Sequence, residues 1–238
     1  MRQRLDKTLV SLGMASTRSQ AENFIKLGTV TVNGEVCRKP GAMVTDNDAL
    51  KVTAEEQYVS RAGLKLMSVA GKLKLNFKGK IMLDVGSSTG GFTDYALQHG
   101  AKRVVAVDVG TNQLHPTLRG HERIDLREQT DIRDVELNAI PDIVTIDVSF
   151  VSLRDILPSV AKLSDANTQI VAMVKPQFEA GQSSIKHKGV IKNDAMRRQV
   201  LKDFETWVQK LFIIVAKADS EVAGAKGNVE RFYLLKKL

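Results

Sequence analysis

The sequence predicts a doubly wound α/β domain with a mostly parallel sheet whose last strand is antiparallel, preceded by a small α+β domain. Three observations support this prediction. Beyond residue 57, apolar segments alternate with helical patterns, which is typical of βαβ units. A glycine-rich turn follows the first of these apolar segments. The final segment follows a connection too short for a crossover helix, which favours an antiparallel strand.

The predicted small domain begins with two helices. Leu5, Leu9 and Leu12 share one helical face, and Gly13 is a suitable end signal. Thr17 followed by Gln20 is the pattern of a capping box at the start of a second helix. This helix is expected to place its apolar residues inward and to end near residue 28.

A hairpin is expected after these helices. Residues 29–32 alternate like a strand, Asn33-Gly34 is a strong turn signal, and residues 35–37 supply the returning strand. A further short strand is predicted over residues 49–52. Residues 53–57 are polar and without periodicity, so they are predicted to be a linker. The predicted domains are therefore residues 1–57 and 58–238.

The second domain is predicted from its apolar segments and end signals. The first predicted helix, residues 91–99, ends before Gly100. The apolar segments before and after it have the composition of buried strands. The predicted strands cover 81–85, 104–108, 143–147, 170–174, 212–218 and 229–236, and the helices cover 91–99 and about 194–210.

Composition narrows the functional classes. The net charge of +8 favours a polyanionic partner, either nucleic acid or an acidic membrane surface. No apolar segment is long enough to span a membrane, and the charged start lacks a secretory signal. Cys37 is the single cysteine and the four histidines are scattered, so we expect no metal site and a cytoplasmic location.

The glycine-rich turn predicts a cofactor site. Asp84 is the penultimate residue of the strand before it, where it is placed to attract the amine of a methionine group. The turn carries Gly86, Ser88, Gly90 and Gly91, and Asp108 ends the next strand. Such glycines allow backbone amides to approach a ligand, and an acid at the second strand end can accept both ribose hydroxyls. The pattern is compatible with S-adenosylmethionine or NAD. Its spacing differs from G-x-G-x-x-G, which makes a pyrophosphate a poor fit.

Four polar segments are expected to face the same crevice, each from a loop or a strand end. Lys175 follows a buried-type strand, so its ammonium group is predicted to enter the crevice directly. A lysine in this position needs carboxylates to remain charged, and Asp147 and Glu230 are the predicted partners. The fourth segment covers residues 60–65 and contains Lys65.

The first domain resembles the S-four-like (alpha-L) RNA-binding domain, through the helix start Thr17-Arg18-Ser19-Gln20-Ala21 and the pattern G-x-V-x-V-N-G over residues 28–34. The resemblance implies RNA binding. Residues 1–45 hold seven Lys or Arg against three acids, a modest excess in the same direction. The candidate RNA-binding residues are Arg4, Lys7, Arg18, Lys26, Arg38 and Lys39.

Over nearly its whole length the chain resembles the TlyA (hemolysin A) family, whose catalytic domain is of the FtsJ (RrmJ) type. The segments that carry the resemblance are VSRAGLKL, LDVGSSTGGFTD, DVSFVSL, VKPQFEAG and GNVERF. It implies S-adenosylmethionine-dependent 2′-O-methylation of ribosomal RNA, usually at cytidine, with ribosomal RNA or a ribosomal subunit as partner. It also implies a catalytic tetrad of Lys65, Asp147, Lys175 and Glu230, an amine contact for Asp147, and an adenine contact for Asp131. Little sequence precedes Leu5 or follows Leu235. In this the chain resembles the shorter subtype of the family, which is linked to large-subunit RNA.

Three alternatives remain at this point. A membrane-active hemolysin is suggested by the older family label, but the sequence offers no spanning segment. A non-catalytic RNA chaperone or assembly factor would use the same fold only to bind RNA. The presence of all four tetrad residues argues against this alternative. An NAD-dependent enzyme is disfavoured by the glycine spacing.

Overall fold

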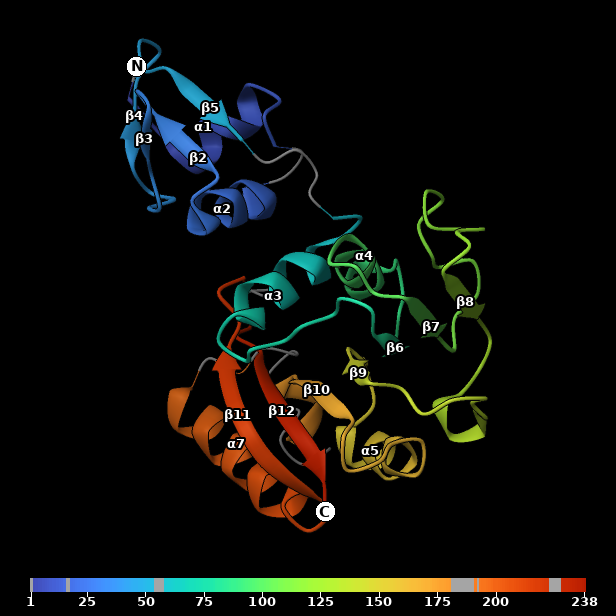
Figure 1. Cartoon of the computed structure of the whole chain (residues 1–238). Coiled ribbons are helices and arrows are strands. Elements are labelled where there is room, and N and C mark those ends of the chain that lie inside the picture. Colours follow the sequence, from blue (N-terminus) through green and yellow to red (C-terminus); the bar gives the residue numbers. More distant parts are fainter. Residues whose placement is uncertain (1, 16–17, 54–57, 181–190, 192, 223–227) are drawn as a thin grey trace. The chain divides into compact units, whose positions relative to one another are not determined.

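The computed structural model describes residues 2–15, 18–53, 58–180, 191, 193–222 and 228–238 (Figure 1). The chain divides into two compact units, residues 1–57 and 58–238. The first unit has one hydrophobic cluster, and the second has one on each face of its sheet. Most of the predicted linker, residues 54–57, lies outside the described residues.

The first unit packs two helices against short antiparallel strands. Strand β2 lies between β3 and β5, and β1 pairs with β4. The β1–β4 pair was not predicted, because strands of two residues leave no alternation to recognise. The elements are β1 (Gln3–Arg4), α1 (Leu5–Ser11), α2 (Arg18–Leu27), β2 (Val30–Val32), β3 (Glu35–Val36), β4 (Met43–Val44) and β5 (Leu50–Val52).

The hairpin turn is confirmed. Asn33 and Gly34 have φ angles of 54° and 87°, and a two-residue type I′ turn requires positive φ at both positions. The placement of Leu12 on the buried helical face is wrong, because this residue is 58% exposed. Helix α1 ends at Ser11, and the chain turns away at Gly13, whose φ is +71°. Thr17 of the predicted capping box lies outside the described residues.

The second unit is built on a seven-stranded sheet in the order β11-β12-β10-β9-β6-β7-β8. Strands β8, β7, β6, β9 and β10 are parallel to one another, and β12 is antiparallel to both β10 and β11. The prediction of a mostly parallel sheet with an antiparallel last strand is therefore confirmed. The strands are β6 (Ile81–Val85), β7 (Arg103–Val107), β8 (Ile124–Arg127), β9 (Ile143–Ile146), β10 (Gln169–Val174), β11 (Phe212–Asp219) and β12 (Arg231–Lys237).

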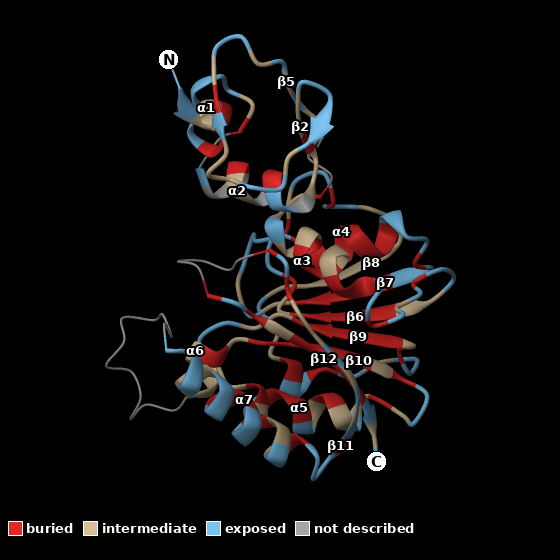
Figure 2. Ribbon diagram, turned by 90° about the vertical axis from the view of Figure 1, so that its left-hand side faces the viewer, coloured by how far each residue is buried: buried red, intermediate tan, exposed pale blue. Residues whose placement is uncertain are grey.

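Helices cover both faces of this sheet, and Figure 2 shows the strands as a buried layer between them. Alternate residues of the strands point to opposite faces, so that Met82 packs with α3 and α4 while Leu83 packs with α5 and α7. The helices are α3 (Arg61–Ala70), α4 (Gly91–Gln98), the 3₁₀ turn η1 (Ile132–Asp134), α5 (Leu153–Lys162), α6 (Pro176–Glu179) and α7 (Asp194–Val208).

Candidate active site

The turn after β6 has a backbone that favours glycine. Gly86 has φ +78°, and a Cβ atom there would lie 2.8 Å from the carbonyl oxygen of Asp147. Ser88 also has a positive φ, 46°, and its amide donates to Asp108 Oδ2 at 2.8 Å. The strand order reverses direction here, since β6 lies between β7 and β9. Ligands bind at such a switch point, beyond the carboxyl ends of the strands.

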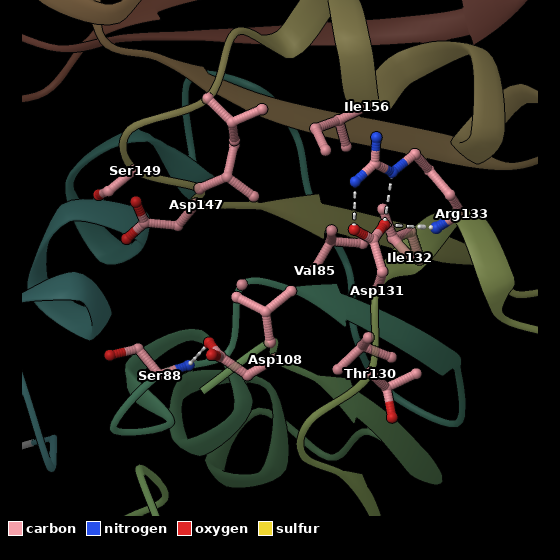
Figure 3. A pocket seen from close by; sticks show the side chains of 15 residues that line it. Val85, Ser88, Asp108, Thr130, Asp131, Ile132, Arg133, Asp147, Ser149 and Ile156 are labelled. Atoms are coloured by element: carbon pink, nitrogen blue, oxygen red, sulfur yellow. Dashed lines mark hydrogen bonds and ion pairs between the residues drawn. The ribbon is translucent and has the colours of Figure 1, made fainter. Parts of the chain in front are cut away.

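A cavity of about 350 Å³ opens at this point (Figure 3). Its apolar walls come mainly from valine and isoleucine side chains, and its polar groups include three carboxylates. In Figure 3, Asp147 and Ser149 lie on one side of the cavity, and Asp131 with Arg133 lies on the other. The lining residues are Val85, Gly86, Ser88, Val107, Asp108, Val109, Thr130, Asp131, Ile132, Arg133, Asp147, Val148, Ser149, Val151 and Ile156.

Two of these carboxylates have defined hydrogen-bond partners. Asp108 accepts from the amides of Ser88 and Gly110, at 2.8 and 2.7 Å, which orients it at the end of β7. Asp131 accepts from Arg133 through Nε at 2.8 Å and through the backbone amide at 2.9 Å. These hydrogen bonds from Arg133 lower the pKa of Asp131 to about 2, so this carboxylate is ionised at neutral pH.

Asp84 lies deeper, at 1% exposure, beside a second cavity of about 70 Å³ that Ser87 and Asp147 also line. Its oxygens accept from the hydroxyls of Thr93 and Thr145, at 2.7 and 2.8 Å. Burial raises the pKa of Asp84 to about 6. The hydroxyl of Ser87 is buried with no hydrogen-bond partner. Ser87 was not among the predicted residues, although it is part of the glycine-rich turn.

Gly90 and Gly91 are not among the described residues that line either cavity. Gly90 has φ +91°. A Cβ atom on Gly91 would collide with Ser60 Oγ and lie 2.8 Å from the amide nitrogen of Gly63. Gly91 therefore lets α4 approach the start of α3 closely. A cofactor role for these two glycines stays a prediction.

The four tetrad candidates form two ion pairs. Lys175 Nζ lies 2.6 Å from Asp147 Oδ1 and donates to Ser149 Oγ at 2.7 Å. Lys65 Nζ lies 2.6 Å from Glu230 Oε2. All four side chains are largely buried, at 4 to 17% exposure. The predicted partner Asp147 lies beside Lys175, but Lys175, Lys65 and Glu230 are not among the described residues that line either cavity. The catalytic roles of the four residues stay predictions.

Two details of the prediction need correction. Glu230 pairs with Lys65 rather than with Lys175, whose second partner is Ser149. Lys65 projects from helix α3, whereas the segment around it was expected to be a loop or a strand end. Ser149 could not be singled out in the sequence beyond its place two residues after Asp147, because a serine after a strand is common.

The predicted RNA-binding residues of the first unit fall into two groups. Arg4 and Arg18 both bind the buried carboxylate of Asp6, at 2.8 and 2.9 Å, and together they lower its pKa. Arg38 donates to the carbonyl of Lys26 at 3.0 Å, near the end of α2. The side chains of Lys7, Lys26 and Lys39 are exposed.

The residues that the structure describes contain no group of three or more His, Cys, Asp or Glu residues that could hold a metal ion. No helix among them is both long enough and apolar enough to cross a membrane.

The fold and the cavity together define an α/β domain of the class that binds a nucleoside-containing cofactor at the switch point of its sheet. The sequence matches the FtsJ-like methyltransferase family over residues 58–237 and the S4 domain over residues 3–50. The chain belongs to the FtsJ-like methyltransferase family.

Similar proteins cover most of the chain. The Bacillus subtilis protein YqxC, provisionally named an rRNA methyltransferase, is 41% identical over 96% of this chain and 84% of its own. The 16S/23S rRNA (cytidine-2′-O)-methyltransferase TlyA of Mycobacterium tuberculosis is 36% identical over 99% of this chain and 90% of its own. The 23S rRNA (cytidine-2′-O)-methyltransferase TlyA of Campylobacter jejuni is 41% identical over 78% and 74%.

A solved structure agrees with these relatives. A Streptococcus thermophilus protein, provisionally named a hemolysin, is 40% identical and superposes with a TM-score of 0.73. The alignment covers 99% of this chain and 88% of that one.

Proposed function

We propose that this protein transfers a methyl group from S-adenosylmethionine to the 2′-hydroxyl of a cytidine in ribosomal RNA, in the cytoplasm. The main observation behind this proposal is the position of Lys175. Its Nζ lies 2.6 Å from Asp147 Oδ1 and 2.7 Å from Ser149 Oγ, and both of these partners line the cavity. The TlyA relatives support the substrate class. Large-subunit RNA is the favoured substrate, because both of those relatives carry 23S in their names.

The residues around the two cavities fit this cofactor. The apolar walls suit an adenine ring, Asp108 is placed for ribose hydroxyls, and Asp131 for the exocyclic amine. The buried, unpartnered hydroxyl of Ser87 and the carboxylate of Asp84 suit the amino-acid end. The cofactor, when bound, supplies an electrophilic methyl group on a sulfonium centre.

The chain's own residues act on the ribose hydroxyl. This hydroxyl is a weak nucleophile because it is only weakly acidic. Lys175 orients it and, after passing one of its own protons to Asp147, takes the hydroxyl proton, while Ser149 holds the lysine in place. Lys65 and Glu230 position the nucleotide. Orientation alone can be worth several kcal/mol, about 7 to 11 at the extreme.

Residues 1–57 form the RNA-binding domain in this proposal, and residues 58–238 form the catalytic domain. Support comes from the S4 match and from the exposed lysines of the first unit. Phosphate contacts dominate the affinity of basic surfaces for nucleic acid.

The decisive test is a map of 2′-O-methylation in ribosomal RNA from cells with and without the gene. We expect one cytidine of the large-subunit RNA to lose its methyl group. Complementation with the wild-type gene should restore it. Calorimetry should detect binding of S-adenosylmethionine and no binding of NAD. An unchanged methylation map would contradict the proposed function.

A further inference from the structure

Two loops carry the groups around Lys175. One follows β9 and holds Asp147 and Ser149; the other follows β10 and begins with Lys175 itself. Helix α6 continues the second loop and ends at Glu179. This glutamate belongs to the segment VKPQFEAG, yet the reaction proposed above gives it no role.

Glu179 binds the far end of the first loop. Its Oε1 accepts from the amide of Leu153 and its Oε2 from the hydroxyl of Ser152, both at 2.7 Å. Ser152 and Leu153 begin helix α5, where unpaired amides and the helix dipole favour an anion. The Glu179 side chain is only 1% exposed, and Arg154 Nε lies 3.9 Å from Oε2.

Burying the Glu179 carboxylate costs free energy that other interactions must compensate. Burial raises the pKa of Glu179, because desolvation disfavours the charged form. Two short hydrogen bonds and a nearby guanidinium compensate that cost. A glutamine would keep one acceptor and remove the charge, whereas an alanine would leave the Leu153 amide without this partner.

The loops are joined at three successive points. Lys175 contacts Asp147 and Ser149, the Phe178 ring lies 5.3 Å from the Phe150 ring, and Glu179 closes the set at Ser152 and Leu153. The contacts run in the same order along both loops. Each contact therefore restricts the register of the next.

We propose that Glu179 is a positioning residue: it clamps the loop after β9 to the loop after β10, and so sets Asp147 and Ser149 at hydrogen-bond distance from Lys175. The inference rests on the proposed methyl transfer. Without the clamp, the first loop shifts relative to Lys175. A misplacement of about 1 Å can cost up to roughly 100-fold in rate.

The test compares the full-length variants Glu179→Ala and Glu179→Gln with the wild type. Glu205→Ala is the matched control, because Glu205 is a partly buried carboxylate on α7 that bonds Lys217 and Tyr233 and touches neither loop. The assays are methylation of large ribosomal subunits, binding of S-adenosylmethionine by calorimetry, and hydrogen exchange of peptides that span residues 147–153.

We expect Glu179→Ala to lower kcat about tenfold or more, with KM for the ribosomal subunit and cofactor affinity within about twofold. Exchange at the Leu153 amide should accelerate. Glu179→Gln should recover part of kcat, and Glu205→Ala should match the wild type in kcat and in exchange at 147–153.

Two results would overturn the inference: unchanged kcat in Glu179→Ala, or unchanged exchange at residues 147–153. Equal losses in kcat and cofactor affinity would mean that Glu179 only supports the fold. If the wild type itself transfers no methyl group, the proposed function fails, while the exchange data still decide whether Glu179 holds the loop.

Discussion

Lys65 and Lys175 are each about 11% exposed, and each faces one carboxylate at 2.6 Å. A buried ammonium group without such a partner would lose its proton or destabilise the fold. Only Lys175 is paired with a residue that lines the larger cavity, and it also bonds Ser149, which lines the same cavity. This difference is the reason why our proposal places Lys175, rather than Lys65, next to the reacting hydroxyl.

Lys175→Ala is expected to reduce methyl transfer by roughly 100- to 10,000-fold, because general acid–base help is lost. RNA binding should change little, since one charge among many contributes modestly. Lys175→Arg should not restore activity, because a guanidinium stays charged and differs in shape. The measurement is single-turnover methylation with saturating cofactor.

Circular dichroism provides the fold check for this variant. Lys72→Ala is its control, since Lys72 forms an exposed pair with Glu221. Near-normal turnover by a folded Lys175→Ala protein would make the catalytic assignment wrong.

The variant Asp84→Asn tests how the buried carboxyl group of Asp84 affects the pH dependence of the free energy of unfolding. The folded-state pKa of Asp84 is raised from 3.8 to about 6, so its ionisation on going from pH 4 to pH 7 opposes folding. The shift corresponds to about 3 kcal/mol as an upper limit. Relative to wild type, Asp84→Asn should therefore gain free energy of unfolding as pH rises from 4 to 7. Urea denaturation at several pH values measures this, and a constant difference would refute it.

At the scale of elements, the site depends on close approach between α3 and α4. Lys65 projects from α3, and the turn that precedes α4 lines the cavity. Cβ atoms on Gly63 and Gly91 would each lie within 3 Å of backbone atoms of the other helix. The two glycines therefore set the spacing between Lys65 and the glycine-rich turn.

Gly91→Ala is expected to destabilise the protein by about 1 to 3 kcal/mol through overpacking. Gly71→Ala is the matched control, because Gly71 ends α3 with a helical backbone and open space around it. That substitution should be neutral or slightly stabilising. Thermal unfolding of both variants measures the difference, and equal melting temperatures would argue against the packing role.

At the scale of the whole molecule, some basic side chains form ion pairs within the protein, and others are exposed and available to bind a polyanion. Arg4 and Arg18 share the buried carboxylate of Asp6, so part of their charge is compensated inside the first unit. Lys7, Lys26 and Lys39 are exposed on the same unit. These three lysines are the better candidates for phosphate contacts.

The triple variant Lys7→Ala, Lys26→Ala and Lys39→Ala should weaken RNA binding and leave S-adenosylmethionine binding intact. Each lost phosphate contact should flatten the log–log salt dependence by about 0.7 to 0.9. Filter binding to ribosomal RNA at several salt concentrations measures the slope. A triple alanine variant at Lys78, Lys102 and Lys202 in the second unit is the control. An unchanged slope in the first variant would remove these lysines from the interface.

Several elements could be predicted from the sequence alone. The strands β6, β7, β9 and β10 are mostly apolar segments, and buried parallel strands have that composition. The Asn33-Gly34 turn and the glycine-rich turn were recognisable because a positive φ restricts the choice of residue. The short final connection indicated the antiparallel β12. In each case the signal is local in the chain.

The rest was decided by tertiary structure. Helix α5 was not predicted because it contains Pro158 in its interior, and packing against the sheet compensates the lost hydrogen bond. The strand β8 has two charged residues among four and is recognisable only by its pairing with β7. The choice of Glu230 for Lys65 and of Ser149 for Lys175 depends on which side chains meet after folding. Sequence patterns determined which groups reach the carboxyl edge of the sheet, because strand ends are local features; distances between those groups exist only in the packed molecule.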